Sequence, residues 1–277
     1  MIRVLALSLS LLSVWSLGLP ALAGGPKADL WARWQAHDPA SARRLDHSAW
    51  GRFLDRYLSV RSKDANRIDY AAVTPADKAA LAGYLADLQA VAVSRLNRAE
   101  QLAFWVNLYN ALTVSLILDH WPVSSIRDID ISPGLFADGP WGKKLVSIEG
   151  ERLALDDIEH RILRPIWRDP RIHYAVNCAS IGCPDLASRP YTADTADRML
   201  TAGAEAYVND PRGAHVDADG RLTVSAIYDW FIDDFGGTRA GVLAHLGHYA
   251  APDLKARLAG RARIDGHAYD WRINAAR

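Results

Sequence analysis

The stretch NRAEQLAFWVNLYNALTVSLILDHWP, residues 97–122, carries the clearest structural signal in the chain. It predicts a long helix that begins after Asn97, whose side chain can cap the first turn, and that ends at about His120, before Trp121-Pro122. Apolar side chains occur all around this helix. A helix that is apolar on every side is buried. We therefore expect the rest of the fold to pack around it.

Small and amide side chains follow one side of the predicted helix. At about 100° per residue, Ala103, Asn107, Asn110 and Val114 fall on the same side. Such a stripe indicates the close approach of another backbone segment, and buried amides need hydrogen-bond partners. We expect Asn107 and Asn110 to tie the helix to neighbouring loops, with a direct role in a site as the alternative. These polar residues also favour a core helix over a membrane span.

The remaining segments predict more helix than strand. Hydrophobic spacing and cap residues predict helices over 29–36, 42–58, 75–91, 156–164, 195–208, 225–237, 239–250 and 253–259. Short strands are predicted over 67–70, 144–148, 152–155, 171–177, 221–224, 262–265 and 269–273. The strands arrive singly or as hairpins. This order predicts one α+β domain over residues 24–277, predominantly helical, with a small and mostly antiparallel β-sheet.

Residues 1–23 have the three parts of a secretory signal peptide. Arg3 precedes an apolar run over 4–19, Pro20 breaks that run, and Ala21-Leu22-Ala23 offers small residues for cleavage. The run is shorter than the roughly 20 residues that a spanning helix needs. We expect cleavage after residue 23, no stable membrane insertion afterwards, and a periplasmic or secreted protein.

Composition narrows the classes of partner. Lys and Arg together number 32, as do Asp and Glu, a balance that argues against nucleic acid or an anionic membrane surface as the main partner. No Gly-rich phosphate loop, nucleophile-elbow serine or paired-histidine zinc helix occurs, so we expect no cofactor. A small-molecule or peptide-like ligand is the expected partner. The chain has only two cysteines, Cys178 and Cys183.

Several blocks of sequence together resemble the domain of unknown function 547 family, over about residues 50–274. The blocks are AFWVNLYNA (103–111), IEH with ILR (158–164), DPRIHYAVNC (169–178), Cys183-Pro184, Tyr191, Trp230, Asp234-Phe235 and Tyr269-Asp270-Trp271. With the leader, the resemblance indicates an exported bacterial member. It implies no defined activity, since the family is named for its unknown function. The chain has Ala-Ser-Ile-Gly over 179–182, where the family more often has a glycine and a basic residue.

Cys178 is the candidate nucleophile, since it follows a predicted strand in a Gly-containing loop. A nucleophilic thiol needs a neighbouring base. If 171–177 is extended, His173 lies roughly 16 Å from Cys178. His160, on a separate helix, is therefore the predicted base, with Asn107 or Glu159 supporting it.

The predicted reaction is a thiol-dependent hydrolysis or transfer on an amide- or peptide-like substrate. Glu159 lies within the apolar face of its helix, where a carboxylate is costly unless paired. The residues expected to contact substrate surround the cysteines and the core helix, and they are His173, Asn177, Cys183, Tyr191 and Asn110.

The alternative is a non-catalytic ligand-binding module. Two cysteines so close together in an exported protein can form a Cys178–Cys183 disulfide that shapes a ligand pocket. His160, His173 and the two cysteines are ligand types that suit zinc, but their spacing matches no zinc motif. We therefore expect no metal site.

Overall fold

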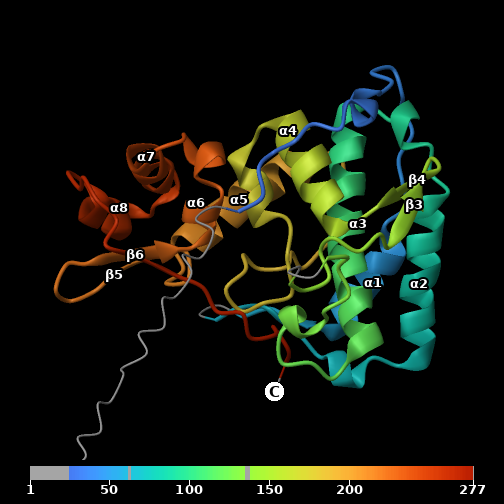
Figure 1. Ribbon diagram of the computed structural model, residues 1–277, viewed down its shortest axis with the longest axis horizontal. Helices are drawn as coiled ribbons and strands as arrows, with labels where there is room; N and C mark the ends of the chain where they lie inside the picture. The colour runs from blue at the N-terminus through green and yellow to red at the C-terminus, as the bar shows by residue number, and fades with distance from the viewer. Residues whose placement is uncertain (1–24, 62–63, 135–137, 277) are drawn as a thin grey trace, which may run out of the picture.

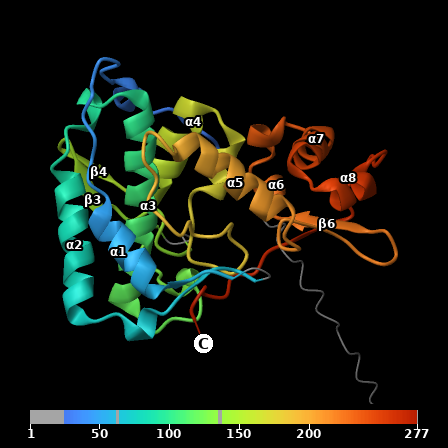
Figure 2. The ribbon, with the colours of Figure 1, turned by 180° about the vertical axis from the view of Figure 1, so that it is seen from behind.

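The computed structural model describes residues 25–61, 64–134 and 138–276. The predicted leader, residues 1–23, lies outside the described residues. Figure 1 shows the arrangement of the described helices and strands, and Figure 2 shows the same ribbon from behind.

The structure is mainly helical. Its α-helices are α1 (Ser48–Tyr57), α2 (Pro75–Gln89), α3 (Arg98–His120), α4 (Arg164–Trp167), α5 (Ala196–Val208), α6 (Ile227–Trp230), α7 (Arg239–Tyr249) and α8 (Pro252–Leu258). Turns of 3-10 helix are η1 (Ala32–Gln35), η2 (Tyr70–Ala72), η3 (Val93–Arg95), η4 (Ile126–Asp128), η6 (Pro170–Tyr174) and η7 (Ile232–Phe235). The segment η5 (Asp157–Leu163) is a π-helix.

The strands are short and form three small sheets. They are β1 (Leu58–Ser59), β2 (Arg67–Ile68), β3 (Val146–Ile148), β4 (Glu151–Leu153), β5 (Ala214–Val216), β6 (Leu222–Ser225) and β7 (Gly266–Ala268). The pairs β1–β2, β3–β4 and β5–β6 are antiparallel, and β6–β7 is parallel. The predicted fold class, helical α+β with small, mostly antiparallel sheets, is confirmed.

Helix α3 forms the centre of the larger core. The Asn97 side chain caps it, accepting a hydrogen bond from Glu100 N at 2.9 Å. Among the described helices, α3 is long and apolar enough to cross a membrane, yet 94% of the apolar 18-residue stretch that makes it so is buried within the protein. In Figures 1 and 2 α1, α2 and α3 lie together at one end of the molecule. The prediction of a buried core helix is confirmed.

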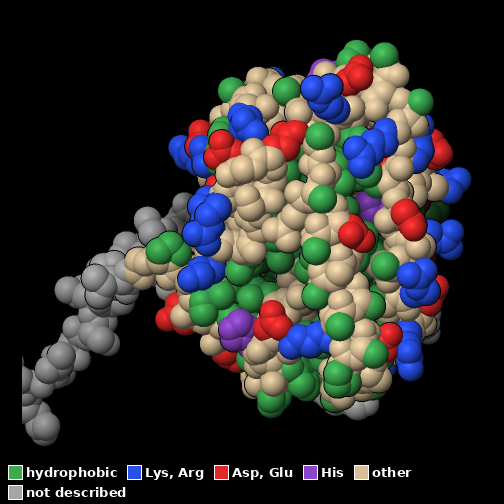
Figure 3. Space-filling model, turned by 90° about the vertical axis from the view of Figure 1, so that its right-hand side faces the viewer, with side chains coloured by type: hydrophobic (Ala, Val, Ile, Leu, Met, Phe, Trp, Pro, Cys, Tyr) green, Lys and Arg blue, Asp and Glu red, His purple; other side chains and the backbone are tan. Residues whose placement is uncertain are grey.

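The hydrophobic core has two parts. The first core surrounds α3 and includes Phe104, Trp105, Ile172 and Val176. The second core lies among α5, the β5–β6 pair, α7 and α8, and includes Tyr174. Figure 1 shows β5, β6, α7 and α8 at the opposite end from α1 and α2, with α5 between them. On the face shown in Figure 3, acidic and basic side chains are intermixed, as the balanced composition implies.

The predicted strand over 171–177 is wrong. Asp169 caps a 3-10 turn instead, accepting a hydrogen bond from Arg171 N at 2.9 Å, and Pro170 begins that turn. The alternation that suggested a strand arises because Ile172 and Val176 enter the first core while Tyr174 enters the second. Apolar residues two apart along this turn are therefore buried in two different cores, which produces the same apolar–polar alternation in sequence as a strand with one buried face.

The predicted stop at Pro165 is also wrong. The helix continues through Pro165 to Trp167, because the preceding residues form the wider π-helix and Pro165 lies in the first turn of α4. A proline is tolerated there. The predicted helix over 225–237 is interrupted at Phe231, which separates α6 from η7. Its predicted end at Gly236 is confirmed, with a left-handed φ of 92°.

Candidate functional site

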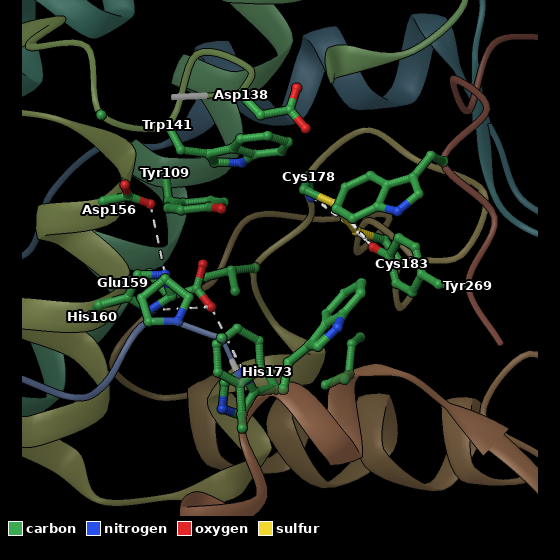
Figure 4. Close-up of a pocket in the computed structure, with 18 of the residues that line it drawn as sticks. Tyr109, Asp138, Trp141, Asp156, Glu159, His160, His173, Cys178, Cys183 and Tyr269 are labelled. Carbon is green, nitrogen blue, oxygen red and sulfur yellow. Dashed lines mark hydrogen bonds and ion pairs between the residues drawn. A yellow bond between two sulfur atoms is a disulfide. The ribbon is translucent and has the colours of Figure 1, made fainter. Parts of the chain in front are cut away.

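A cavity of about 540 Å³ lies between η5, the loop after η6 and the C-terminal segment. Its lining combines aromatic side chains with a smaller set of polar ones. The aromatic residues are Tyr109, Trp141, Trp230, Phe231, Tyr269 and Trp271, and the polar ones include Asp138, Asp156, Glu159, His160, His173, Cys178 and Cys183. Figure 4 shows the cysteines and Tyr269 on one side of the cavity, with Glu159, His160 and His173 on another.

The π-helix η5 presents Glu159 and His160 together. Both side chains line the cavity, and the two residues are 8% and 7% exposed. A π-helical turn is wider than a turn of regular α-helix and is frequently found at functional sites. Glu159 Oε1 lies 3.9 Å from His160 Nδ1 and 3.7 Å from His173 Nδ1.

His160 is held in its neutral form. Arg164 Nη1 donates a hydrogen bond to His160 Nδ1 at 2.9 Å, which leaves the ring proton on Nε2. Burial lowers the pKa of His160 to about 4, although the nearby Glu159 charge opposes this shift. Nε2 lies 3.7 Å from Asp156 Oδ1, at the edge of the cavity.

Asp234 fixes His173 and Arg164 behind the cavity. Its Oδ2 accepts hydrogen bonds from Arg164 Nε at 2.6 Å and from His173 Nε2 at 2.7 Å. Although burial opposes it, these two hydrogen bonds bring the pKa of Asp234 down to about 2. Asp234, which the sequence analysis named only as part of a family block, is therefore a positioning residue of the site.

Asp156 has a perturbed carboxyl group. Burial raises its pKa to about 6, and repulsion from Glu159 and Asp157 adds to the shift, while Lys144 opposes it. Tyr109, on α3, contributes no further charge. Burial holds its pKa well above its usual value, and the neighbouring Glu159 carboxylate raises it further. Perturbed titratable groups gathered in one cavity are typical of functional sites.

The two cysteines form a disulfide in the cavity wall. Cys178 N donates a hydrogen bond to Cys183 Sγ at 3.1 Å, and Tyr269 OH lies 3.1 Å from Cys178 Sγ and 3.0 Å from Cys183 Sγ. Cys178 is partly exposed, whereas Cys183 is 4% exposed. The two sulfur atoms are thus covalently bonded to each other, and the polar groups nearest to them are hydroxyl groups rather than histidines.

Four aromatic rings form a continuous wall beside the disulfide. The centroid of the Trp271 ring lies 5.8 Å from that of Trp141, 5.5 Å from that of Trp230 and 4.6 Å from that of Tyr269. On the other side, Phe231 stacks on His173 at 4.5 Å. Rings packed this tightly form a preformed apolar surface, as expected of a small-molecule site.

The predicted amide residues lie behind the site. Asn107 Nδ2 donates to Tyr191 O at 2.7 Å, and its Oδ1 accepts from Tyr191 N at 2.9 Å. Asn110 bonds in the same way to Ala175 O and Asn177 N. The predicted ties to neighbouring loops are thus present.

The structure brings together only part of the predicted site. Cys178, Cys183, Glu159, His160 and His173 line one cavity. The remaining predicted residues are not among those that line it, namely Asn107, Asn110, Asn177 and Tyr191. In the described part of the chain, no three His, Cys, Asp or Glu side chains are arranged to hold a metal ion.

Sequence reasoning missed the aromatic residues and Asp156. Trp230, Tyr269 and Trp271 were named only within the family blocks. The approach of Tyr269 and Trp271 depends on the C-terminal segment returning to the cavity. Ile181 N donates to Arg272 O at 2.8 Å, and Gly182 N to Asp270 O at 2.8 Å, which joins this segment to the cysteine loop. Such long-range pairing has no local sequence signal.

Comparison with known proteins gives one match. The family model described as "Protein of unknown function, DUF547" matches residues 93–208. Neither the curated proteins nor the solved structures gave a match. The matched range contains α3, η5, η6 and the disulfide, and therefore most of the polar side of the cavity. Over residues 93–208, this chain is a member of the DUF547 family of proteins of unknown function.

Proposed function

We propose that the protein binds a small-molecule or peptide-like ligand in this cavity, with the Cys178–Cys183 disulfide as a fixed part of the wall. The observation that carries the proposal is the cavity itself, in which an aromatic wall, a disulfide and a buried carboxylate–histidine cluster face one space. An apolar cavity with a few convergent polar groups and perturbed pKa values is the usual form of a ligand site.

Binding fits the geometry better than thiol chemistry does. A nucleophilic cysteine needs a base within hydrogen-bond reach. Here both sulfurs are bridged, and the nitrogens of His160 and His173 face Arg164, Asp156, Glu159 and Asp234. A bridge closing so short a loop also constrains the unfolded chain only modestly, which favours local shaping of the cavity as its role.

We also propose that the protein is exported, to the periplasm or beyond the cell, after removal of residues 1–23. The leader pattern in the sequence supports this, and a bridged cysteine pair is compatible with an oxidising compartment.

A fragment screen tests the binding function. Ligand-observed NMR would compare the wild-type protein with Val176→Phe, which places a larger side chain at a buried residue of the cavity lining. Val60→Phe, at an exposed position 65% accessible, is the matched control. We expect apolar fragments to bind the wild type and Val60→Phe, and to bind folded Val176→Phe at least about tenfold more weakly. Absence of binding, or equal binding to both variants, contradicts the proposal.

A second candidate is the thiol-dependent hydrolase or transferase. The observation that favours it is that Cys178 is partly exposed and lines the cavity, so reduction of the bridge would release a thiol there. Reduced and oxidised protein would be assayed against a panel of amide and peptide substrates. Turnover only after reduction, abolished in Cys178→Ala and retained in Cys183→Ala, supports the enzyme. Turnover by Cys178→Ala equal to that of the reduced wild type contradicts the thiol-dependent enzyme.

A further inference from the structure

We propose that the ligand of this cavity carries a cationic amine or ammonium group, which lies between the carboxylates of Asp156 and Glu159 and the rings of Tyr109 and Trp141. The inference rests on the proposed binding function and adds the charge of the ligand to it. It follows from an imbalance of charge in the cavity wall and from the chemistry of the rings beside it.

The charged lining residues of the described cavity are all acidic apart from its histidines. Asp138, Asp156 and Glu159 line it, and no Lys or Arg does. The nearby cations already have carboxylate partners. Lys144 pairs with Asp157, Arg127 with Asp138, and Arg164 with Asp234.

Glu159 is a buried carboxylate that, among the described residues, pairs with histidines and with no Lys or Arg. Its carboxylate lies 3.7–3.9 Å from the histidine nitrogens, beyond the length of a strong charge-assisted hydrogen bond. His160 is neutral, since its Nδ1 accepts from Arg164. His173 lies between Glu159 and Asp234, so a single positive charge on its ring would be shared by two carboxylates. A buried charge without a full counter-charge is costly.

Asp156 adds a second negative charge at the same place. Its Oδ1 lies 3.7 Å from His160 Nε2, and its side chain is 44% exposed. Repulsion from Glu159 contributes to its raised pKa. A cation between the two carboxylates would relieve this repulsion, whereas an anionic ligand would increase it.

The neighbouring rings suit an organic cation with an apolar body. Asp156 N donates a hydrogen bond to Trp141 O at 3.1 Å, so these two residues are neighbours. Figure 4 shows Tyr109 between Trp141 and Glu159. A cation is attracted to the face of an aromatic ring. The tryptophan wall that continues from Trp141 through Trp271 to Trp230 would contact the rest of the ligand.

Three probes that share a phenyl ring test the inference: 2-phenylethylamine, 2-phenylethanol and 3-phenylpropionate. Their affinities would be measured by tryptophan fluorescence and calorimetry at pH 7.5, for the wild type, Glu159→Gln and Asp156→Asn. Glu205→Gln, an exposed glutamate on α5, is the matched control. Circular dichroism would establish that each variant is folded.

We expect the amine to bind about tenfold or more tightly than the alcohol, and the carboxylate to bind most weakly. Glu159→Gln and Asp156→Asn should each weaken amine binding and leave alcohol binding unchanged, while Glu205→Gln changes neither. Equal binding of amine and alcohol, or amine binding unaffected in both cavity variants, overturns the cation inference and leaves the binding function standing. If none of the three probes binds, the cation inference and the binding function both fail.

Discussion

Asp234 Oδ2 accepts a hydrogen bond from His173 Nε2 at 2.7 Å, although 61 positions separate the two residues. Asp234 belongs to η7, next to the second core, and His173 belongs to η6, beside the cavity. The same carboxylate oxygen accepts from Arg164, whose guanidinium lies 4.5 Å from the centre of the Phe231 ring. This contact therefore connects the second core to the polar side of the cavity.

Loss of the Asp234 carboxylate should destabilise the fold. Asp234→Asn leaves Arg164 and His173, both almost fully buried, without their anion, and we expect a loss of about 2–4 kcal/mol in unfolding free energy at pH 7. Urea denaturation measures this. Asp233→Asn, at the exposed neighbouring residue, is the control and should change stability little.

The Asp234 contribution should depend on pH in one direction. Its pKa in the folded protein, about 2, lies below its usual value of 3.8, so the carboxylate stabilises the fold above about pH 4. The difference between wild type and Asp234→Asn should shrink as the pH falls from 4 toward 2. A difference that stays constant over this range contradicts the ion-pair explanation.

Asp156 should behave in the opposite way. Its folded pKa, about 6, lies above its usual value of 3.8, so folding favours the protonated form and stability falls as the pH rises from about 4 to 6. We expect Asp156→Asn to raise the Tm at pH 7.5 by about 2–4 °C, a shift discounted for the exposure of the carboxylate, and to change it little at pH 4.

Asp157→Asn is the matched comparison for Asp156→Asn. Asp157 is buried, pairs with Lys144 and accepts a hydrogen bond from Ala154 N at 2.7 Å. Its loss should lower the Tm at pH 7.5. Thermal unfolding followed by circular dichroism measures both variants. A lower Tm for Asp156→Asn at pH 7.5 would show that its carboxylate stabilises the fold and would remove the evidence for repulsion in the cavity.

Asn107 should act on stability rather than on ligand binding. Asn107→Ala leaves both backbone groups of Tyr191 without their partner, at an expected cost of about 2–4 kcal/mol. The helix cap variant Asn97→Ala should cost less, about 1 kcal/mol. Urea denaturation ranks the two. Unchanged stability together with lost binding in Asn107→Ala would instead assign this residue to the site.

Local signals in the sequence predicted much of the helical frame. Caps at Thr74 and Asn97 mark the starts of α2 and α3, and Gly236 marks the end of η7. Hydrophobic periodicity misled over 171–177, because residues two apart enter different cores. The Asp169-Pro170 pair, a typical cap and first-turn combination, was the available signal for the 3-10 turn.

The site was predictable only where its residues are close in sequence. Glu159 carried a signal of its own, a carboxylate on an apolar helix face, and it does line the cavity. His160, predicted as the base, also lines the cavity, whereas no local pattern indicated that η5 is a π-helix. Asp234 and Trp271 reach the site through long-range packing, so the sequence alone did not place them there.

Whether Cys178 and Cys183 are bridged distinguishes the two proposed functions, a ligand-binding cavity and a thiol-dependent enzyme. A count of free thiols tests this most directly. The protein would be produced with its own first 23 residues, isolated without reductant, alkylated under denaturing conditions and weighed by mass spectrometry. We predict no alkylated cysteine before reduction and two after it. Two alkylated cysteines without reductant, with Cys178 in the native protein reacting faster than a model thiol, would contradict the disulfide wall and favour the nucleophile.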